Sequence, residues 1–159
     1  MPSVCFLLMV GTIVRIQLRR KVKMAVIEEL IRLEEDGRIS FGNYLMDEKK
    51  KVLDFEVCGN LYKVKTYKDI TKLEKNGKML LETVPGATIH NFGMDAKTVD
   101  FLVESNDDVQ ITMELEPEKE YKLLVDDVVV GKINSNIGGK VNFSVELNNS
   151  CSKVKIEKI

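Results

Sequence analysis

The alternation of apolar and polar residues between residues 98 and 147 limits most strongly how this chain can fold. Val99, Phe101 and Val103 alternate with mostly polar side chains, and residues 109–115 and 141–147 repeat the pattern. A period of two places every second side chain on the same face of a β-strand. Two sheets that pack apolar face against apolar face bury all of these stripes at once. We therefore expect a mainly β chain with an antiparallel β-sandwich domain over residues 87–159.

The region before residue 87 also predicts strands and turns. Gly59-Asn60 indicates a turn, and Asn76-Gly77 is a strong hairpin signal between residues 70–75 and 78–84. Asp126-Asp127 indicates a further turn within the sandwich domain. We expect residues 38–86 to form a β-hairpin arm, and we group it with the preceding helix as a unit over residues 24–86.

A short amphipathic helix is predicted over residues 25–36. The apolar residues recur at helical spacing with charged residues between them, and Gly37 follows as a C-terminal stop. This apolar stripe must cover either the β core or the same stripe on a second subunit. The residues of the possible oligomer face are Val26, Ile27, Leu30 and Ile31.

The first 23 residues have a different character from the rest. The apolar run at residues 4–10 is shorter than the roughly 20 residues that a helix needs to cross a bilayer. Five basic residues follow this run, whereas a secretory signal carries its positive charge before it. We interpret residues 1–23 as a non-globular extension or a wrong start, with translation beginning at Met24; a signal anchor is the alternative.

Charge and cysteine content bear on partners and location. Residues 87–159 contain 8 Lys and 13 Asp or Glu, a net charge of −5, which repels phosphate backbones and anionic membranes. We therefore expect neither a nucleic acid nor a membrane as partner. Cys5, Cys58 and Cys151 are odd in number and form no CxxC pair, which favours a reducing, cytoplasmic setting. A secreted or surface-associated protein is the alternative.

Candidate catalytic and metal-binding residues are few. His90 is the one histidine, and no motif supplies a nucleophile for it, so a structural or exposed role is favoured over catalysis. Asp107-Asp108 and Asp126-Asp127 offer oxygen ligands for Ca²⁺, but aspartates at such turns usually serve the turn itself. We predict no metal and no cofactor.

Three segments carry a family resemblance: MAVIEELIRLEEDGRISFGNY, DFEVCGNLYKVKTYKDITKLEKNGKMLLETVPG and GGKVNFSVEL. They resemble a family of short, uncharacterised proteins of anaerobic Gram-positive bacteria, sometimes labelled endosialidase, over residues 24–159. The resemblance implies a start at Met24 and, if the protein is an enzyme, a glycoside hydrolase of endosialidase type. No sialidase Ser-x-Asp-x-Gly-x-Thr-Trp box occurs, and Arg32 and Arg38 are the only arginines after Met24.

Two classes of function follow from these observations. The leading hypothesis is a non-catalytic β module that acts by self-assembly or binding, as a homo-oligomer. The alternative is a carbohydrate-active protein, either glycan-binding or an endosialidase-like glycosidase, with a glycan as its ligand. The catalytic residues of such an enzyme stay unknown, because the acidic residues provide many candidates and mark none.

Overall fold

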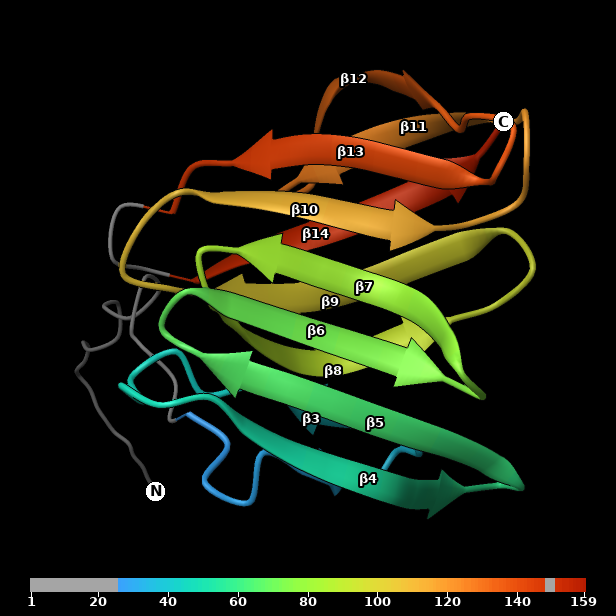
Figure 1. Ribbon diagram of the computed structural model, residues 1–159. Helices are drawn as coiled ribbons and strands as arrows, with labels where there is room; N and C mark the ends of the chain where they lie inside the picture. Colours follow the sequence, from blue (N-terminus) through green and yellow to red (C-terminus); the bar gives the residue numbers. More distant parts are fainter. Residues whose placement is uncertain (1–25, 148–150) are drawn as a thin grey trace, which may run out of the picture.

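The computed structural model describes residues 26–147 and 151–159, and every helix or strand assigned in these ranges is a β-strand (Figure 1). The strands form two antiparallel sheets, one lying in front of the other. The six-stranded sheet has the spatial order β13 (Lys140–Val145), β10 (Val109–Glu114), β7 (Lys78–Val84), β6 (Ile70–Lys75), β5 (Asn60–Tyr67) and β4 (Lys50–Val57). The seven-stranded sheet has the order β12 (Val128–Asn134), β11 (Glu120–Val125), β14 (Cys151–Lys158), β9 (Thr98–Glu104), β8 (Thr88–Met94), β3 (Ile39–Phe41) and β2 (Ile31–Leu33). The predicted mainly β class with antiparallel sheets is confirmed.

The core lies between the sheets and consists of the apolar faces that the alternation predicts. In β13 every second residue is buried, and Phe143 and Val141 lie opposite Ile111 and Met113 of β10. Phe101 of β9 belongs to the same cluster of buried side chains, which draws on both sheets. The two layers therefore pack in a sandwich-like manner, each sheet turning one face inward.

The predicted boundary at residue 86 does not separate the two sheets. Residues 50–84 supply β4, β5, β6 and β7 of the six-stranded sheet, and β10 and β13 complete it. In the other sheet β3 pairs with β8. The region predicted as an arm therefore lies within the same two-sheet body as residues 87–159.

The predicted helix over residues 25–36 is wrong for the described residues. Leu30 has φ 73, which a right-handed helix excludes, and Ile31–Leu33 pairs with Ile39–Phe41 as strand β2. The backbone N–H of Gly42 donates to the carbonyl of Leu30, which ties the segment to the end of β3. Sheet pairing and burial of Ile31 override the helical spacing, because tertiary contacts outweigh local propensity.

The turns predicted from dipeptide signals are confirmed, with one shift. Asn76 and Gly77 have φ 51 and 84 between β6 and β7, the positive values that a two-residue hairpin turn requires. Asp126 and Asp127 have φ 52 and 66 between β11 and β12. The turn predicted at Gly59-Asn60 lies one residue earlier, because Cys58 and Gly59 take the positive φ values.

Candidate functional site

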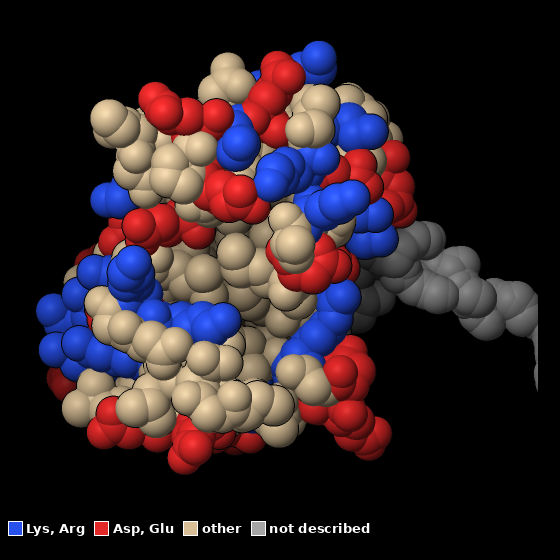
Figure 2. All heavy atoms as spheres, turned by 90° about the vertical axis from the view of Figure 1, so that its right-hand side faces the viewer, with Lys and Arg blue, Asp and Glu red and all other residues tan. Residues whose placement is uncertain are grey.

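One end of the molecule is hollowed between the two sheets. The hollow has a volume of about 340 Å³ and receives residues from both sheets, with Ile39, Leu80 and Phe92 among its apolar lining. Figure 2 looks into this end and shows a floor of residues other than Lys, Arg, Asp and Glu, with charged side chains of both signs around it. The strands β4, β6 and β8 end here, so loop and strand-end residues form the rim.

Two smaller hollows extend the first one along the same end. A hollow of about 250 Å³ shares Lys75 and Leu80 with it and adds Glu114. A hollow of about 60 Å³ shares Met94 and Asp95 with it. We call these three adjoining hollows the end groove. It combines apolar surface with separate positive and negative groups, which is typical of a site for a polar ligand with several hydrogen-bonding groups.

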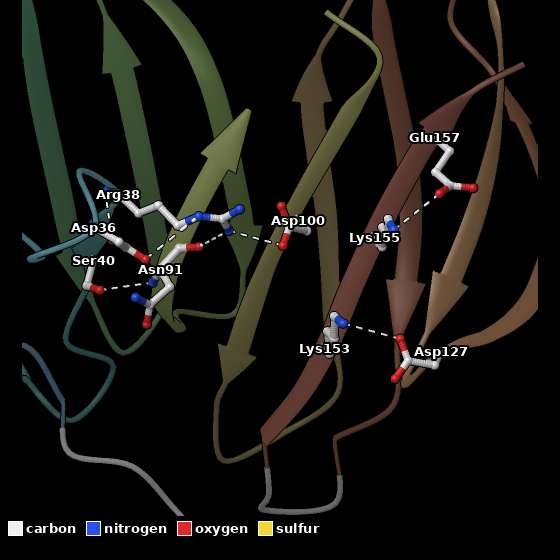
Figure 3. Close-up of polar contacts among 9 residues, drawn as sticks. All are labelled: Asp36, Arg38, Ser40, Asn91, Asp100, Asp127, Lys153, Lys155 and Glu157. Carbon is white, nitrogen blue, oxygen red and sulfur yellow. Dashed lines mark hydrogen bonds and ion pairs between the residues drawn. The ribbon is translucent and has the colours of Figure 1, made fainter. Parts of the chain in front are cut away.

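Arg38 lines the end groove and is held by contacts to three other residues (Figure 3). Its Nη1 donates to the carbonyl oxygen of Asn91 and to Oδ2 of Asp100, both at 3.0 Å, and Nε lies 4.0 Å from Oδ2 of Asp36. The hydrogen bond to Asp100 raises the pKa of the guanidinium further above its already high value. The Arg38 side chain keeps 37% of its surface exposed, so the group is both oriented and accessible.

The backbone of β8 is shaped to receive this guanidinium. The pairing of β8 with β9 shifts register between His90 and Gly93, and Asn91 within this irregularity has φ 54. A Cβ atom at Gly93 would lie 2.5 Å from Cζ of Arg38. Glycine at this strand position therefore lets the guanidinium lie against the backbone, as expected where a side chain approaches a strand closely.

Two other polar groups of the end groove, Asp95 and Tyr62, have shifted pKa values. The backbone N–H groups of Lys97 and Thr98 donate to Asp95 and lower the pKa of its carboxyl group. Burial raises the pKa of the Tyr62 hydroxyl. At neutral pH the end groove therefore presents a carboxylate acceptor, a neutral hydroxyl and a guanidinium donor.

The structure places His90 outside the end groove, in a buried polar cluster. His90 is 2% exposed, and its Nε2 lies 3.4 Å from Oε1 of the fully buried Glu104. Burial lowers the pKa of the imidazole against the opposing effect of Glu104. Tyr44 belongs to the same cluster: burial and the charge of Glu104 raise the pKa of its hydroxyl to about 12. A cluster closed to solvent in this way supports the structural reading of His90.

The predicted oligomer face is not an exposed stripe. Ile27, Leu30 and Ile31 are 0%, 8% and 3% exposed, and Val26 is half-buried. Leu30 and Ile31 belong to the main core cluster of the same chain. These residues therefore cover the β core, which was the other role considered for them.

Three of the predicted turn aspartates connect their turns to segments far away in the sequence. A side-chain oxygen of Asp108 accepts a hydrogen bond from the backbone N–H of Leu147, and one of Asp126 accepts from that of Lys153. Asp127 forms an ion pair with the Lys153 ammonium at 3.2 Å (Figure 3). Residues 26–147 and 151–159 contain no cluster of three or more His, Cys, Asp or Glu residues that would hold a metal ion.

The sequence did not reveal the end groove. Two residues could have indicated it. Arg38 is one of few arginines after Met24, and a glycine inside a strand, such as Gly93, often marks a place where another group approaches the backbone closely. Cys58 is exposed and Cys151 is half-buried, and no disulfide joins these two cysteines. Cys5 lies outside the described residues.

Comparison with known proteins gives no match: no family model, no curated protein and no solved structure is similar to this chain. The part of the chain that the structure describes has no helix of the length and apolar character needed to cross a membrane. The function is therefore inferred from the geometry alone.

Proposed function

We propose that this protein is a non-catalytic binding module and that the end groove is its ligand site. The observation that carries the proposal is the preorganised Arg38, which Asp100 and the Asn91 carbonyl hold in one orientation while its side chain stays partly exposed. A charged donor that is already fixed loses little side-chain entropy on binding, which favours recognition. The apolar lining beside it provides contact area.

Asp95 and Asp100 of the end groove suit binding better than acid catalysis. A glycosidase needs one carboxylic acid that keeps its proton near neutral pH. Asp100 accepts a charge-assisted hydrogen bond from Arg38, and backbone donors lower the pKa of Asp95. Both groups are therefore suited to accept hydrogen bonds from a ligand.

The ligand class that fits best is a short, hydroxyl-rich molecule such as a glycan. Each sugar hydroxyl both donates and accepts hydrogen bonds, and the end groove offers acceptors at Asp95 and Asp100 beside donors at Arg38 and Lys75. Tyr62 adds an aromatic ring of the kind on which a sugar ring packs. This observation favours glycan binding within the carbohydrate-active alternative.

The test is an NMR titration of the isotope-labelled protein with a panel of short glycans. We compare the wild type with Gly93→Ala, which displaces the Arg38 guanidinium and keeps its charge, and with Gly131→Ala, whose Cβ meets nothing within 4 Å. We expect shift changes at the end groove and an affinity loss of about tenfold or more in Gly93→Ala only, as for a lost charge-assisted hydrogen bond. Shift changes mapping elsewhere, or equal affinities in all three proteins, would contradict the proposal.

Self-assembly, the other activity in the leading hypothesis, would use a sheet edge. Among the edge strands, β2 has three residues and β4 and β12 carry register shifts, whereas β13 pairs regularly with β10 over six residues. Short or bulged edges resist pairing with a second chain, and a regular edge does not. The oligomeric state of the wild type and of Asn142→Lys, measured by light scattering, tests the β13 edge. A monomeric wild type would exclude self-assembly through this edge.

A further inference from the structure

The outer face of the six-stranded sheet carries three lysines in one row across neighbouring strands. Lys51 of β4 lies directly opposite Lys65 of β5, which lies directly opposite Lys72 of β6. The inward-facing residues next to them, such as Val64 and Leu73, are fully buried, so the lysines point away from the core. Neighbouring strands are about 4.8 Å apart, and like charges directly opposite one another destabilise a sheet. Such a row therefore lowers the stability of the sheet.

Two further lysines enlarge the row into a compact cationic area. Lys63 lies two residues before Lys65 on the same face of β5, and Lys49 lies close enough for its charge to affect Lys65. We call Lys49, Lys51, Lys63, Lys65 and Lys72 the lysine face. Figure 2 shows Lys and Arg side chains gathered at the left, where this side of the six-stranded sheet lies in that view.

The lysine face is poorly neutralised by the protein itself. Among the described residues, Lys72 is its only member with an ion pair, to Glu74 at 3.8 Å, and Glu74 also lies directly opposite Lys63. Partial burial lowers the pKa of the Lys65 ammonium, and three neighbouring lysine charges lower it further. The row ends at Glu82 of β7, which lies opposite Lys72. The positive charge is therefore concentrated over β4, β5 and β6.

The overall charge of −1 does not cancel this local field. Exposed charges farther apart than about 8–10 Å are largely screened at physiological salt. A ligand at the lysine face therefore experiences its five ammonium groups more strongly than the acidic residues of distant turns. The expectation that the protein repels anionic surfaces was drawn from net charge. It does not apply to the lysine face.

From this geometry we propose that the lysine face docks on an anionic lipid surface. Lys51, Lys63, Lys65 and Lys72 lie on one face of the sheet, and none of the five lysines lines a hollow of the end groove. Leu61, 45% exposed, shares the face of Lys63 and Lys65 and can contact the headgroup region. Single-stranded nucleic acid needs aromatic platforms for its bases, and Tyr67 is the only aromatic residue on this face of β4, β5 and β6. Clusters of basic residues are typical of binding to acidic lipids.

The test is vesicle flotation at low and high salt, with phosphatidylcholine vesicles that contain or lack phosphatidylglycerol. The triple variant Lys51→Gln/Lys65→Gln/Lys72→Gln removes the row. The matched control Lys122→Gln/Lys132→Gln/Lys155→Gln removes the same charge from the outer face of the other sheet, where Lys122 and Lys155 pair with Glu157. Single-stranded DNA and heparin serve as competitors.

We expect the wild type and the control to float with anionic vesicles and to be released by salt. Each lysine near the surface contributes about fivefold in affinity, so the row variant should bind on the order of 100-fold more weakly. Its thermal midpoint should equal or exceed that of the wild type, because like-charge repulsion is removed. If the row variant is unfolded, Lys51→Gln alone, at the exposed edge strand, must show the fivefold loss. No flotation of the wild type, equal binding by row and control variants, or tighter binding to DNA or heparin would overturn the proposal.

Discussion

The hydroxyl of Thr71 links the six-stranded sheet to the segment that leads into β8, and its removal tests the packing of the two sheets. Thr71 is fully buried, and its Oγ1 donates to the carbonyl of Ala87 at 2.7 Å and accepts from the Ala87 N–H at 3.1 Å. It also lies 2.8 Å from Oγ1 of Thr66. Thr71→Val keeps the shape of the side chain but leaves two buried backbone groups of Ala87 without this partner.

The expected cost follows from those two groups. A buried polar group without a partner costs about 1–3 kcal/mol, so the loss of two partners in Thr71→Val should lower the free energy of unfolding by about 2–6 kcal/mol. The control is Thr112→Val on the outer face of the same sheet, where Thr112 accepts from Asn142 at 2.6 Å and water can replace the bond. We expect the control to change stability by less than about 0.5 kcal/mol.

Urea unfolding measures both variants. With a slope of about 2 kcal/mol per molar, the midpoint of Thr71→Val should fall by about 1–3 M at unchanged slope. The midpoint of Thr112→Val should stay near that of the wild type. Equal midpoints for the two variants would refute the reasoning, because they would mean that the Thr71 hydroxyl does not join the two layers.

Two further predictions concern pH and backbone conformation. Because burial lowers the pKa of His90 below its usual value near 6.5, the unfolded chain binds the proton first, and stability should fall as pH drops below about 6.5. Since His90 is the only histidine, its NMR titration identifies the group, and a native pKa at or above 6.5 would contradict this expectation. Gly37→Ala and Gly42→Ala both place alanine at positive φ, 87 and 101, but only at Gly42 does the Cβ collide with the Ala87 carbonyl oxygen. We expect a loss of about 1 kcal/mol for the first and a clearly larger loss for the second in urea unfolding, and equal losses would disprove the close contact.

The N-terminal segment shows where sequence reasoning failed. The apolar residues Ile27, Leu30 and Ile31 lie at helical spacing. They are buried without a helix, because Leu30 has a positive φ and Ile31 begins the short strand β2. The spacing of apolar residues indicates which side chains are buried, but over so short a stretch it does not decide which backbone conformation buries them. The neighbouring strand β3 supplied the hydrogen bonds that decided the outcome.

The sequence by itself determined the class of fold, because alternation and turn chemistry are local properties of the chain. The spacing of Val99, Phe101 and Val103 is enough to define one face of a strand. The positive φ values of Asn76 and Gly77 are enough to define a turn. These signals do not depend on which strand becomes the neighbour.

The tertiary structure alone decided where charges meet. Arg38 reaches Asp100, 62 residues away, because β3 and β9 both flank β8. Lys51, Lys65 and Lys72 form a row only through the register of β4, β5 and β6. A slip of one residue in that register would turn a side chain to the other face of the sheet, so the lysine face depends on the register of consecutive hairpin strands. The Arg38–Asp100 contact of the end groove depends on pairing between segments far apart in the sequence.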